Sequence, residues 1–134
     1  MMNPLRKGSD AERRLVNLLK SRGFNAYRVA GSKGMKNVDV IAMYDGKLFI
    51  FQVKSTKYDK IRVSRREIKN LVDLYNRHKA FVYLAVKFGR EWRFYHVAYL
   101  WSLLSGVFET FEIIPKNGVK LDDMIKNINQ ANKK

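Results

Sequence analysis

The sequence predicts an α/β protein with a central mixed β-sheet flanked by helices. Stretches with apolar residues at helical spacing alternate with short apolar runs typical of strands, in the order α-β-β-β-α-β-β-α. Residues 37–55 (NVDVIAMYDGKLFIFQVKS) place two such runs on either side of Asp45-Gly46, a dipeptide typical of two-residue type I′ hairpins. Residues 80–86 (AFVYLAV) form a continuous apolar run, as expected of a buried strand.

Length and charge limit what the protein can be. The chain has 134 residues, which fits one domain that begins with a mobile basic arm at residues 1–7 and ends in a polar tail at residues 129–134. Lysine and arginine number 27 against 12 aspartates and glutamates, and the net charge of +15 predicts a polyanionic partner. DNA, RNA and an anionic membrane all qualify. The membrane is the least favoured, because no amphipathic stretch is both basic and without another role.

Several classes of protein are excluded by what the sequence lacks. It has no cysteine, which excludes disulfides, thiolate chemistry and cysteine-based metal sites. It has no phosphate-binding P-loop or dinucleotide fingerprint, so no small-molecule organic cofactor is expected. No apolar run approaches the span of about 20 residues that a membrane helix needs, and the first residues lack the apolar core of a signal peptide. We therefore expect a soluble intracellular protein of the cytoplasm.

The first third of the chain predicts a helix, a strand and a loop. Ser9 and Glu12 have the spacing of a capping box at a helix start, and Gly23 is placed to end that helix. The apolar face of the helix consists of Ala11, Leu15, Leu18 and Leu19. Residues 24–29 are expected to form a short strand, followed by a flexible loop at residues 30–36.

The predicted hairpin brings polar side chains together. With Asp45 and Gly46 as the loop, Tyr44 faces Lys47 and Asp39 lies opposite Gln52, while Asn37 faces Lys54. Because side chains alternate between the faces of a strand, the polar side chains share one face and Phe49, Phe51 and Val53 point to the other. Two interpretations stay open: the polar residues form a functional site, or they belong to a face in contact with solvent.

The remaining elements follow in order. Ile61 and Val63 favour a short strand, and Ser64 with Glu67 forms a second capping box. The helix that it starts has Ile68, Leu71, Val72 and Tyr75 on one face. After the buried strand at residues 80–86, residues 92–97 return as another strand, and a last helix carries an apolar face of Leu121, Met124, Ile125 and Ile128. No catalytic or DNA-binding role is assigned to residues 99–118.

The polar cluster fits a metal-dependent phosphodiesterase. Such an enzyme needs oxygen ligands for a hard divalent ion and a basic group near the attacking water. Asp39 supplies a carboxylate, and Gln52 and the backbone of Val53 supply carbonyl oxygens. Lys54 is the candidate for orienting the water or stabilising the charged phosphate. Glu12 adds a carboxylate if the first helix packs across the polar face of the hairpin, although a capping box alone explains its presence.

Basic residues surround the proposed site and are expected to contact the DNA backbone. Because the sequence contains no base-reading helix signature, phosphate contacts are favoured over base reading. The alternative is an ordinary solvated surface. In the N-terminal arm, the glycine loop and the connector after the hairpin, the candidate DNA-binding residues are Lys7, Lys33, Lys36, Lys57, Lys60, Arg62, Arg65 and Arg66.

With these residues in place, the sequence resembles the archaeal Holliday junction resolvases of the PD-(D/E)XK restriction-endonuclease-like nucleases. Three segments carry the resemblance in order: KGSDAERRLVNLLKSRGFNAYRVAGSKGMKNVDVIA, FQVKSTKYDKIRVSRREIKNLVDL and AVKFGREWRFYHV. They cover most of the chain from Lys7 to Val97. The resemblance implies a restriction-endonuclease-like fold, a homodimer and cleavage of four-way DNA junctions that depends on Mg²⁺, with Mn²⁺ as a substitute.

The resemblance also implies roles for single residues. The N-terminal glutamate and arginine of the family fall on Glu12 and Arg13, its motif aspartate on Asp39 and its motif lysine on Lys54. A strand-end arginine falls on Arg28 as a DNA-binding residue, and a loop serine falls on Ser32 as a catalytic residue. The sequence departs from the family pattern E-V-K at Gln52, and this change removes one negative charge from the metal site.

Three functional hypotheses follow. The first is a Holliday junction resolvase that nicks four-way junctions symmetrically, with Glu12, Asp39 and Gln52 holding the metal and Lys54 assisting the water. The second is a restriction-like or repair nuclease that acts on other DNA. The third is a DNA-binding module whose catalysis is impaired because Gln52 replaces the usual glutamate. Residues 99–108 and the tyrosine-bearing face of the second helix are candidate dimer surfaces, with ordinary core as the alternative.

Overall fold

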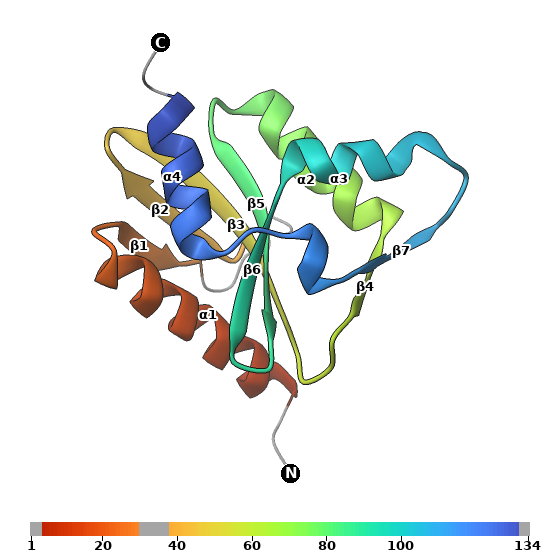
Figure 1. Cartoon of the computed structure of the whole chain (residues 1–134), viewed down its shortest axis with the longest axis horizontal. Coiled ribbons are helices and arrows are strands. Elements are labelled where there is room, and N and C mark those ends of the chain that lie inside the picture. Colours follow the sequence, from red (N-terminus) through yellow and green to blue (C-terminus); the bar gives the residue numbers. More distant parts are fainter. Residues whose placement is uncertain (1–3, 30–37, 132–134) are drawn as a thin grey trace.

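The computed structural model describes residues 4–29 and 38–131, and the side chains of residues 10–29 and 38–130 (Figure 1). Its helices and strands are α1 (Pro4–Ser21), β1 (Asn25–Arg28), β2 (Val40–Tyr44), β3 (Lys47–Thr56), β4 (Ile61–Ser64), α2 (Arg65–Arg77), β5 (Phe81–Phe88), β6 (Glu91–His96), α3 (Val97–Ser102), β7 (Thr110–Ile113) and α4 (Leu121–Ala131). Short 3₁₀ turns η1 (Leu103–Ser105) and η2 (Pro115–Asn117) flank β7. Within the described ranges, no helix is long and apolar enough to cross a membrane.

The main sheet is mixed, as the sequence predicts. Its five strands run in the order β1-β2-β3-β5-β6, and only the β3–β5 pair is parallel. The crossover between those two strands contains β4 and α2, which is the kind of connection that a parallel pair requires. β4 leaves the main sheet and pairs with β7 in a separate two-stranded sheet.

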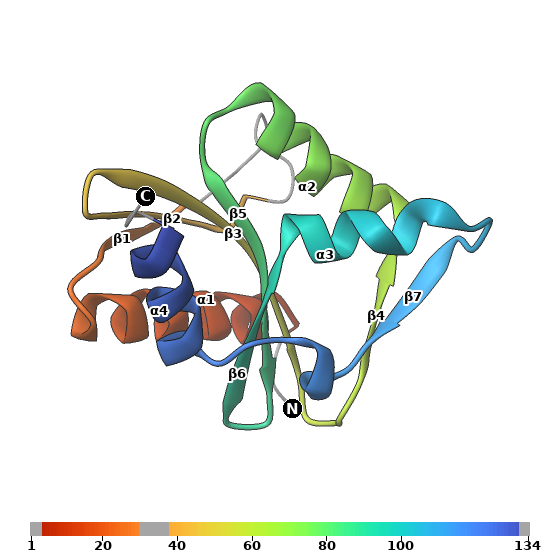
Figure 2. The ribbon, with the colours of Figure 1, turned by 45° about the horizontal axis from the view of Figure 1, so that its top comes forward.

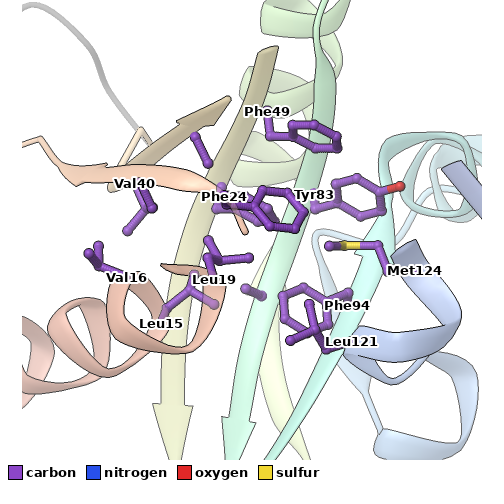
Figure 3. Close-up of a cluster of buried hydrophobic side chains, with 14 of the residues drawn as sticks. Leu15, Val16, Leu19, Phe24, Val40, Phe49, Tyr83, Phe94, Leu121 and Met124 are labelled. Atoms are coloured by element: carbon purple, nitrogen blue, oxygen red, sulfur yellow. The ribbon is translucent and has the colours of Figure 1, made fainter. Parts of the chain in front are cut away.

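Helices cover both faces of the main sheet. α1 and α4 lie on one side and α2 and α3 on the other, which the turned view separates clearly (Figures 1 and 2). The first side buries Leu15 and Leu19 of α1 and Met124 of α4 against Phe49 and Phe94 of the sheet (Figure 3). The second side buries α2 and α3 against the opposite faces of β3 and β5. β3 is therefore buried on both faces, and polar residues on it are costly unless they are paired.

The hairpin has the predicted turn and register. Asp45 and Gly46 have φ angles of 51° and 73°, so both central residues are left-handed, as a type I′ turn requires. The ladder pairs Tyr44 with Lys47 and Val40 with Phe51, in the predicted register. Asp39 directly precedes β2, and its N–H donates to the Phe51 carbonyl at 2.9 Å. Asn37 lies outside the described residues.

Two predictions about the ends of the chain are wrong. α1 begins at Pro4, so residues 4–7 belong to a helix instead of a mobile arm, and Ser9 lies within the helix and is not its N-cap. Proline is well suited to a first helical turn, and the buried face of Ala11, Leu15 and Leu19 stabilises a helix long enough to tolerate Gly8. At the other end, α4 continues to Ala131, so residues 129–131 are helical and not part of a tail.

Residues 99–118, which have no assigned catalytic or DNA-binding role, include the end of α3 and strand β7, and Arg65 contacts the connection between these two elements. The guanidinium of Arg65, the first residue of α2, donates to the carbonyl oxygens of Leu104, Gly106 and Phe108 at 3.0, 2.5 and 2.8 Å. The backbone N–H of Arg65 also donates to the Glu109 carbonyl at 2.8 Å. Arg65 thus holds the connection between α3 and β7 against the start of α2. It was predicted to bind DNA, and the structure gives its donors this other role.

Gly23 ends α1 as the sequence predicts. It has a φ of 91°, its N–H donates to the Lys20 carbonyl at 3.1 Å, and the Phe24 N–H donates to the Leu19 carbonyl at 3.1 Å. This pair of bonds is a Schellman motif, which redirects the chain from the helix into β1. Phe24 then enters the same apolar cluster as Leu19.

We predict that Gly23→Ala lowers the free energy of unfolding by about 1 kcal/mol, because a Cβ atom disfavours the left-handed backbone. Gly23→Asn should cost less, since asparagine tolerates this conformation better. Urea unfolding measures both. Gly106→Ala is the matched control because Gly106 has an ordinary φ of −106°. Equal stability of the two alanine variants would contradict the prediction.

Candidate active site

Gln52 and Lys54 of β3 point to the face of the sheet that α2 covers, together with Ile50. Only 6% of Gln52 is exposed, and 25% of the Lys54 side chain. This face of β3 is therefore not a solvated surface, and the alternative of a face in contact with water is wrong for these residues. A buried amide and a largely buried ammonium need partners, which the neighbouring elements supply.

Asp39 is held against β3 from the neighbouring chain segment. Its Oδ2 accepts a hydrogen bond from the N–H of Val53, the residue between Gln52 and Lys54, at 2.8 Å. Burial raises the pKa of the Asp39 carboxyl above its ordinary value, and the Val53 hydrogen bond and the charge of Lys54 only partly oppose that increase. Asp39 thus lies within electrostatic reach of Lys54 at one end of the hairpin, next to the segment of β3 that contains Gln52. Metal coordination would relieve the cost of this buried charge.

Glu12 lies near the site, but α1 packs on the other face of the sheet from the one predicted. α1 covers the face with Phe49 and Phe51, opposite to the face of Gln52 and Lys54. The Glu12 Oε1 accepts from Arg28 Nε at 3.0 Å, where β1 ends beside α1. Burial raises the pKa of Glu12, Arg28 opposes this effect, and the negative charge of Asp39 adds to it. Glu12 and Asp39 therefore lie within electrostatic reach of one another.

Glu67 is the site residue that sequence reasoning missed. Its Oε2 lies 2.6 Å from Lys54 Nζ and accepts from Gln52 Nε2 at 3.0 Å. Its other oxygen completes the predicted capping box by accepting from the Ser64 N–H at 3.1 Å. Burial acts to raise the pKa of Glu67, but hydrogen bonds from Lys54 and Ser64 outweigh it and hold the pKa below its usual value. The capping box was recognised in the sequence, but its position over the polar face of β3 depends on the fold.

The oxygen donors of this site suit a magnesium ion. Carboxylates and carbonyls are the ligands that Mg²⁺ prefers, and it commonly binds through one or two carboxylates together with water and substrate phosphates. In the part of the chain that the structure describes, no three histidine, cysteine, aspartate or glutamate side chains gather as a complete protein cage for a metal. An ion held by these residues would need further ligands from water or substrate. Ser32 lies outside the described residues.

The predicted DNA-binding residues fall into several groups. Lys57 in the connection between β3 and β4, Arg62 on β4 and Arg66 in the first turn of α2 are exposed. Ion pairs join Arg13 to Asp10, Arg28 to Glu12 and Lys60 to Glu112. Lys33, Lys36 and the side chain of Lys7 lie outside the described parts of the structure.

Comparison with known proteins assigns the chain to a family. The pattern of the archaeal Holliday junction resolvase (Hjc) family matches residues 3–133. The chain belongs to this family. Among its curated members, the crossover junction endodeoxyribonuclease Hjc of Methanocaldococcus jannaschii is 38% identical over 94 residues, which are 70% of this chain and 68% of that protein. The endodeoxyribonuclease Hje of Saccharolobus solfataricus is 29% identical over 125 residues, or 89% of this chain and 87% of that protein.

Solved structures agree with the assignment to the Hjc family. The Holliday junction resolvase Hjc of Archaeoglobus fulgidus superposes with a TM-score of 0.74 at 28% identity, over 90% of this chain and 96% of that one. The bacterial homing endonuclease I-Ssp6803I superposes with a TM-score of 0.62 at 15% identity, over 99% of this chain and 98% of that one, which is a likeness of fold alone. The restriction-endonuclease-like fold predicted from the sequence is confirmed.

We predict that Asp39→Asn leaves the metal-free protein as stable as the natural protein at pH 7, or more stable. A carboxyl whose pKa is raised by folding contributes stability only at low pH, and this contribution is lost as the pH rises through the raised value. The ionised Asp39 is therefore a cost at neutral pH, which the neutral amide removes. The gain should vanish at pH values below the usual value of 3.8.

Urea unfolding without divalent metal, measured at several pH values, checks this expectation. Asp73→Asn is the matched control, because Asp73 is exposed on α2 and pairs with Arg77, so that its loss is neutral or slightly destabilising. If Asp39→Asn destabilised the protein more than Asp73→Asn at pH 7, Asp39 would be a structural residue.

Proposed function

We propose that this protein is a structure-selective DNA endonuclease, a Holliday junction resolvase that cuts four-way junctions by metal-dependent hydrolysis of phosphodiesters. The observation that carries the proposal is the Asp39 carboxylate, which the Val53 N–H holds beside Lys54 in a chain of the Hjc family. This arrangement places an acidic metal ligand and a cation next to one another, as phosphodiester cleavage requires.

Mg²⁺, or Mn²⁺ in its place, is the proposed cofactor. The Asp39 carboxylate and the carbonyl oxygens of Gln52 and Val53 would hold it, with Glu12 close enough to contribute through its charge or through water. When bound, the ion supplies an activated water and neutralises charge on the phosphate. No organic cofactor is proposed.

The residues of the chain itself position the reaction. Lys54 would orient the attacking water and stabilise the negative charge that grows on the phosphate. The buried Gln52 and the Val53 N–H hold their neighbours in place on a central strand, which restricts movement of the site. Arg28, which pairs with Glu12 at 3.0 Å, is proposed to contact a DNA phosphate.

A homodimer would match the symmetry of the substrate. A four-way junction and a two-fold dimer share a symmetry axis, so two active sites at a fixed separation would nick opposite strands symmetrically. Of the dimer surface predicted at residues 99–108, Leu100 is a core residue, but Trp101, Val107 and Phe108 are 51%, 90% and 68% exposed. On α2, Tyr75 is 43% exposed, whereas Ile68 and Leu71 are buried. These exposed side chains are the proposed dimer contacts.

We predict that the protein with Mg²⁺ cuts a four-way junction into symmetric nicked duplexes and leaves a linear duplex of the same sequence nearly intact. A chelator should abolish cutting. Asp39→Asn should reduce the cutting rate by at least about 100-fold, because it removes the charge that holds the ion, while junction affinity stays nearly unchanged. Gel assays of cleavage and binding measure all three.

Two outcomes of these assays would contradict the proposed function. Equal cutting of junction and linear duplex would indicate a restriction-like or repair nuclease instead of a resolvase. Junction binding without any cutting in Mg²⁺ or Mn²⁺ would indicate a DNA-binding module. The Asp73→Asn variant serves again as a control for the removal of one carboxylate.

We also predict that junction affinity falls steeply with salt concentration, since the basic surface displaces counterions from phosphates. Arg62→Ala and Arg66→Ala should each reduce the slope of log affinity against log salt by about one, at all junction sequences. Arg77→Ala is the control, because Arg77 lies in the last turn of α2 and pairs with Asp73. Titrations at several salt concentrations measure the slopes, and a flat response of the natural protein would contradict the role of its charge.

A further inference from the structure

Glu67 has a second set of contacts that its capping role does not require. A capping box needs one oxygen of the glutamate, and Oε1 serves this purpose at 3.1 Å from the Ser64 nitrogen. The other oxygen, Oε2, points to the opposite side and contacts Lys54 Nζ at 2.6 Å and Gln52 Nε2 at 3.0 Å. These two partners are both residues of the Q-V-K sequence on β3. One carboxylate thus joins the start of α2 to the candidate active site.

We propose that Glu67 supplies the active-site carboxylate that is missing at Gln52, and that it serves as a metal ligand in the cleavage reaction. This inference rests on the proposed function and adds a residue to its site. The acidic group is carried by the crossover helix α2 instead of strand β3, while the amide of Gln52 holds it in position.

The distances support a carboxylate at position 67 in place of one at position 52. The Gln52 nitrogen and the Glu67 oxygen are only 3.0 Å apart, so a carboxylate at either position places its charge in almost the same volume. Lys54 lies within ion-pair distance of Glu67 and within electrostatic influence of Asp39. The site therefore has two carboxylates around one lysine, although β3 itself contributes neither of them.

Burial and position support the same conclusion. The Glu67 side chain is 26% exposed, so solvent and ions can still reach it. Its Oε2 lies on the side of Lys54 and Gln52, the two residues of β3 that belong to the candidate active site. A carboxylate that remains partly accessible beside this site is suited to bind a hard cation.

The alternative is that Glu67 only caps α2 and neutralises Lys54. A double replacement separates the two roles, because glutamine can take the third position of a capping box as well as glutamate. Glu67→Gln therefore keeps the cap and removes the charge. The combined variant Gln52→Glu with Glu67→Gln returns one carboxylate to the site, on the strand instead of the helix. Ser64→Ala weakens the cap and retains the carboxylate.

The experiment measures Mn²⁺ binding by calorimetry without DNA, thermal unfolding, and cleavage of a four-way junction. Glu67→Gln should fold normally, bind Mn²⁺ at least about 10-fold more weakly and cut far more slowly. The combined variant should recover Mn²⁺ affinity and cleavage to within a few-fold of the natural protein. Ser64→Ala should unfold at a lower temperature with Mn²⁺ affinity unchanged, and Glu91→Gln, an exposed residue of β6, should change neither property.

Two outcomes would overturn the inference. The first is a folded Glu67→Gln variant with unchanged Mn²⁺ affinity and cleavage. The second is a folded combined variant that recovers neither property, because position 52 then cannot replace position 67. If the natural protein cuts no junction, the proposed function fails, and the Mn²⁺ affinities of the same variants still decide whether Glu67 is a metal ligand.

Discussion

The pairing register of β3 is the constraint on which the rest of this structure depends. β3 has hydrogen-bonded neighbours on both sides and helices over both faces, so a slip of one residue would move Phe49 and Phe51 out of one core and Gln52 and Lys54 into it. The type I′ turn at Asp45-Gly46 sets the register from one end. At the other end, Asp39 donates its N–H to the Phe51 carbonyl and accepts from the Val53 N–H. Those bonds join the fold to the candidate chemistry.

Two helices bring carboxylates to this strand from opposite sides, and their ion pairs differ. Glu12 of α1 pairs with Arg28 at the end of β1, whereas Glu67 of α2 pairs with Lys54 on β3 itself. Burial and Asp39 raise the pKa of Glu12, but the bonds from Lys54 and Ser64 lower that of Glu67. Burial therefore prevails at Glu12 in spite of its ion pair with Arg28, whereas at Glu67 the hydrogen bonds from Lys54, Ser64 and Gln52 together outweigh it. Charge at the site is distributed over several elements, so loss of a carboxylate from β3 does not leave Lys54 without an anionic partner.

The fold was largely predictable because its signals are local. The hairpin turn, the Gly23 helix end, the Ser64 cap and the apolar faces of α2 and α4 each depend on residues close together in the sequence. The features that the sequence did not predict lie at positions where distant packing overrides local propensity. α1 extends back to Pro4 because its apolar face is anchored in the core, and β7 forms because β4 provides an edge for it. Arg65 looked like one more surface cation, but backbone carbonyls more than 35 residues away use its donors.

The sequence by itself determined the strand that carries the chemistry and the mutual placement of Asp39, Gln52 and Lys54, because a tight turn and the alternation of side chains relate them. The resemblance to the Hjc family could also be recognised from the sequence alone. Only the tertiary structure decided which helix lies over the polar face. Glu12 and Glu67 both stand at capping-box spacing, and nothing local distinguishes the helix that packs on Gln52 from the one on the opposite face. That choice depends on how the crossover containing α2 returns to the sheet, and it places the Glu67 carboxylate beside Lys54.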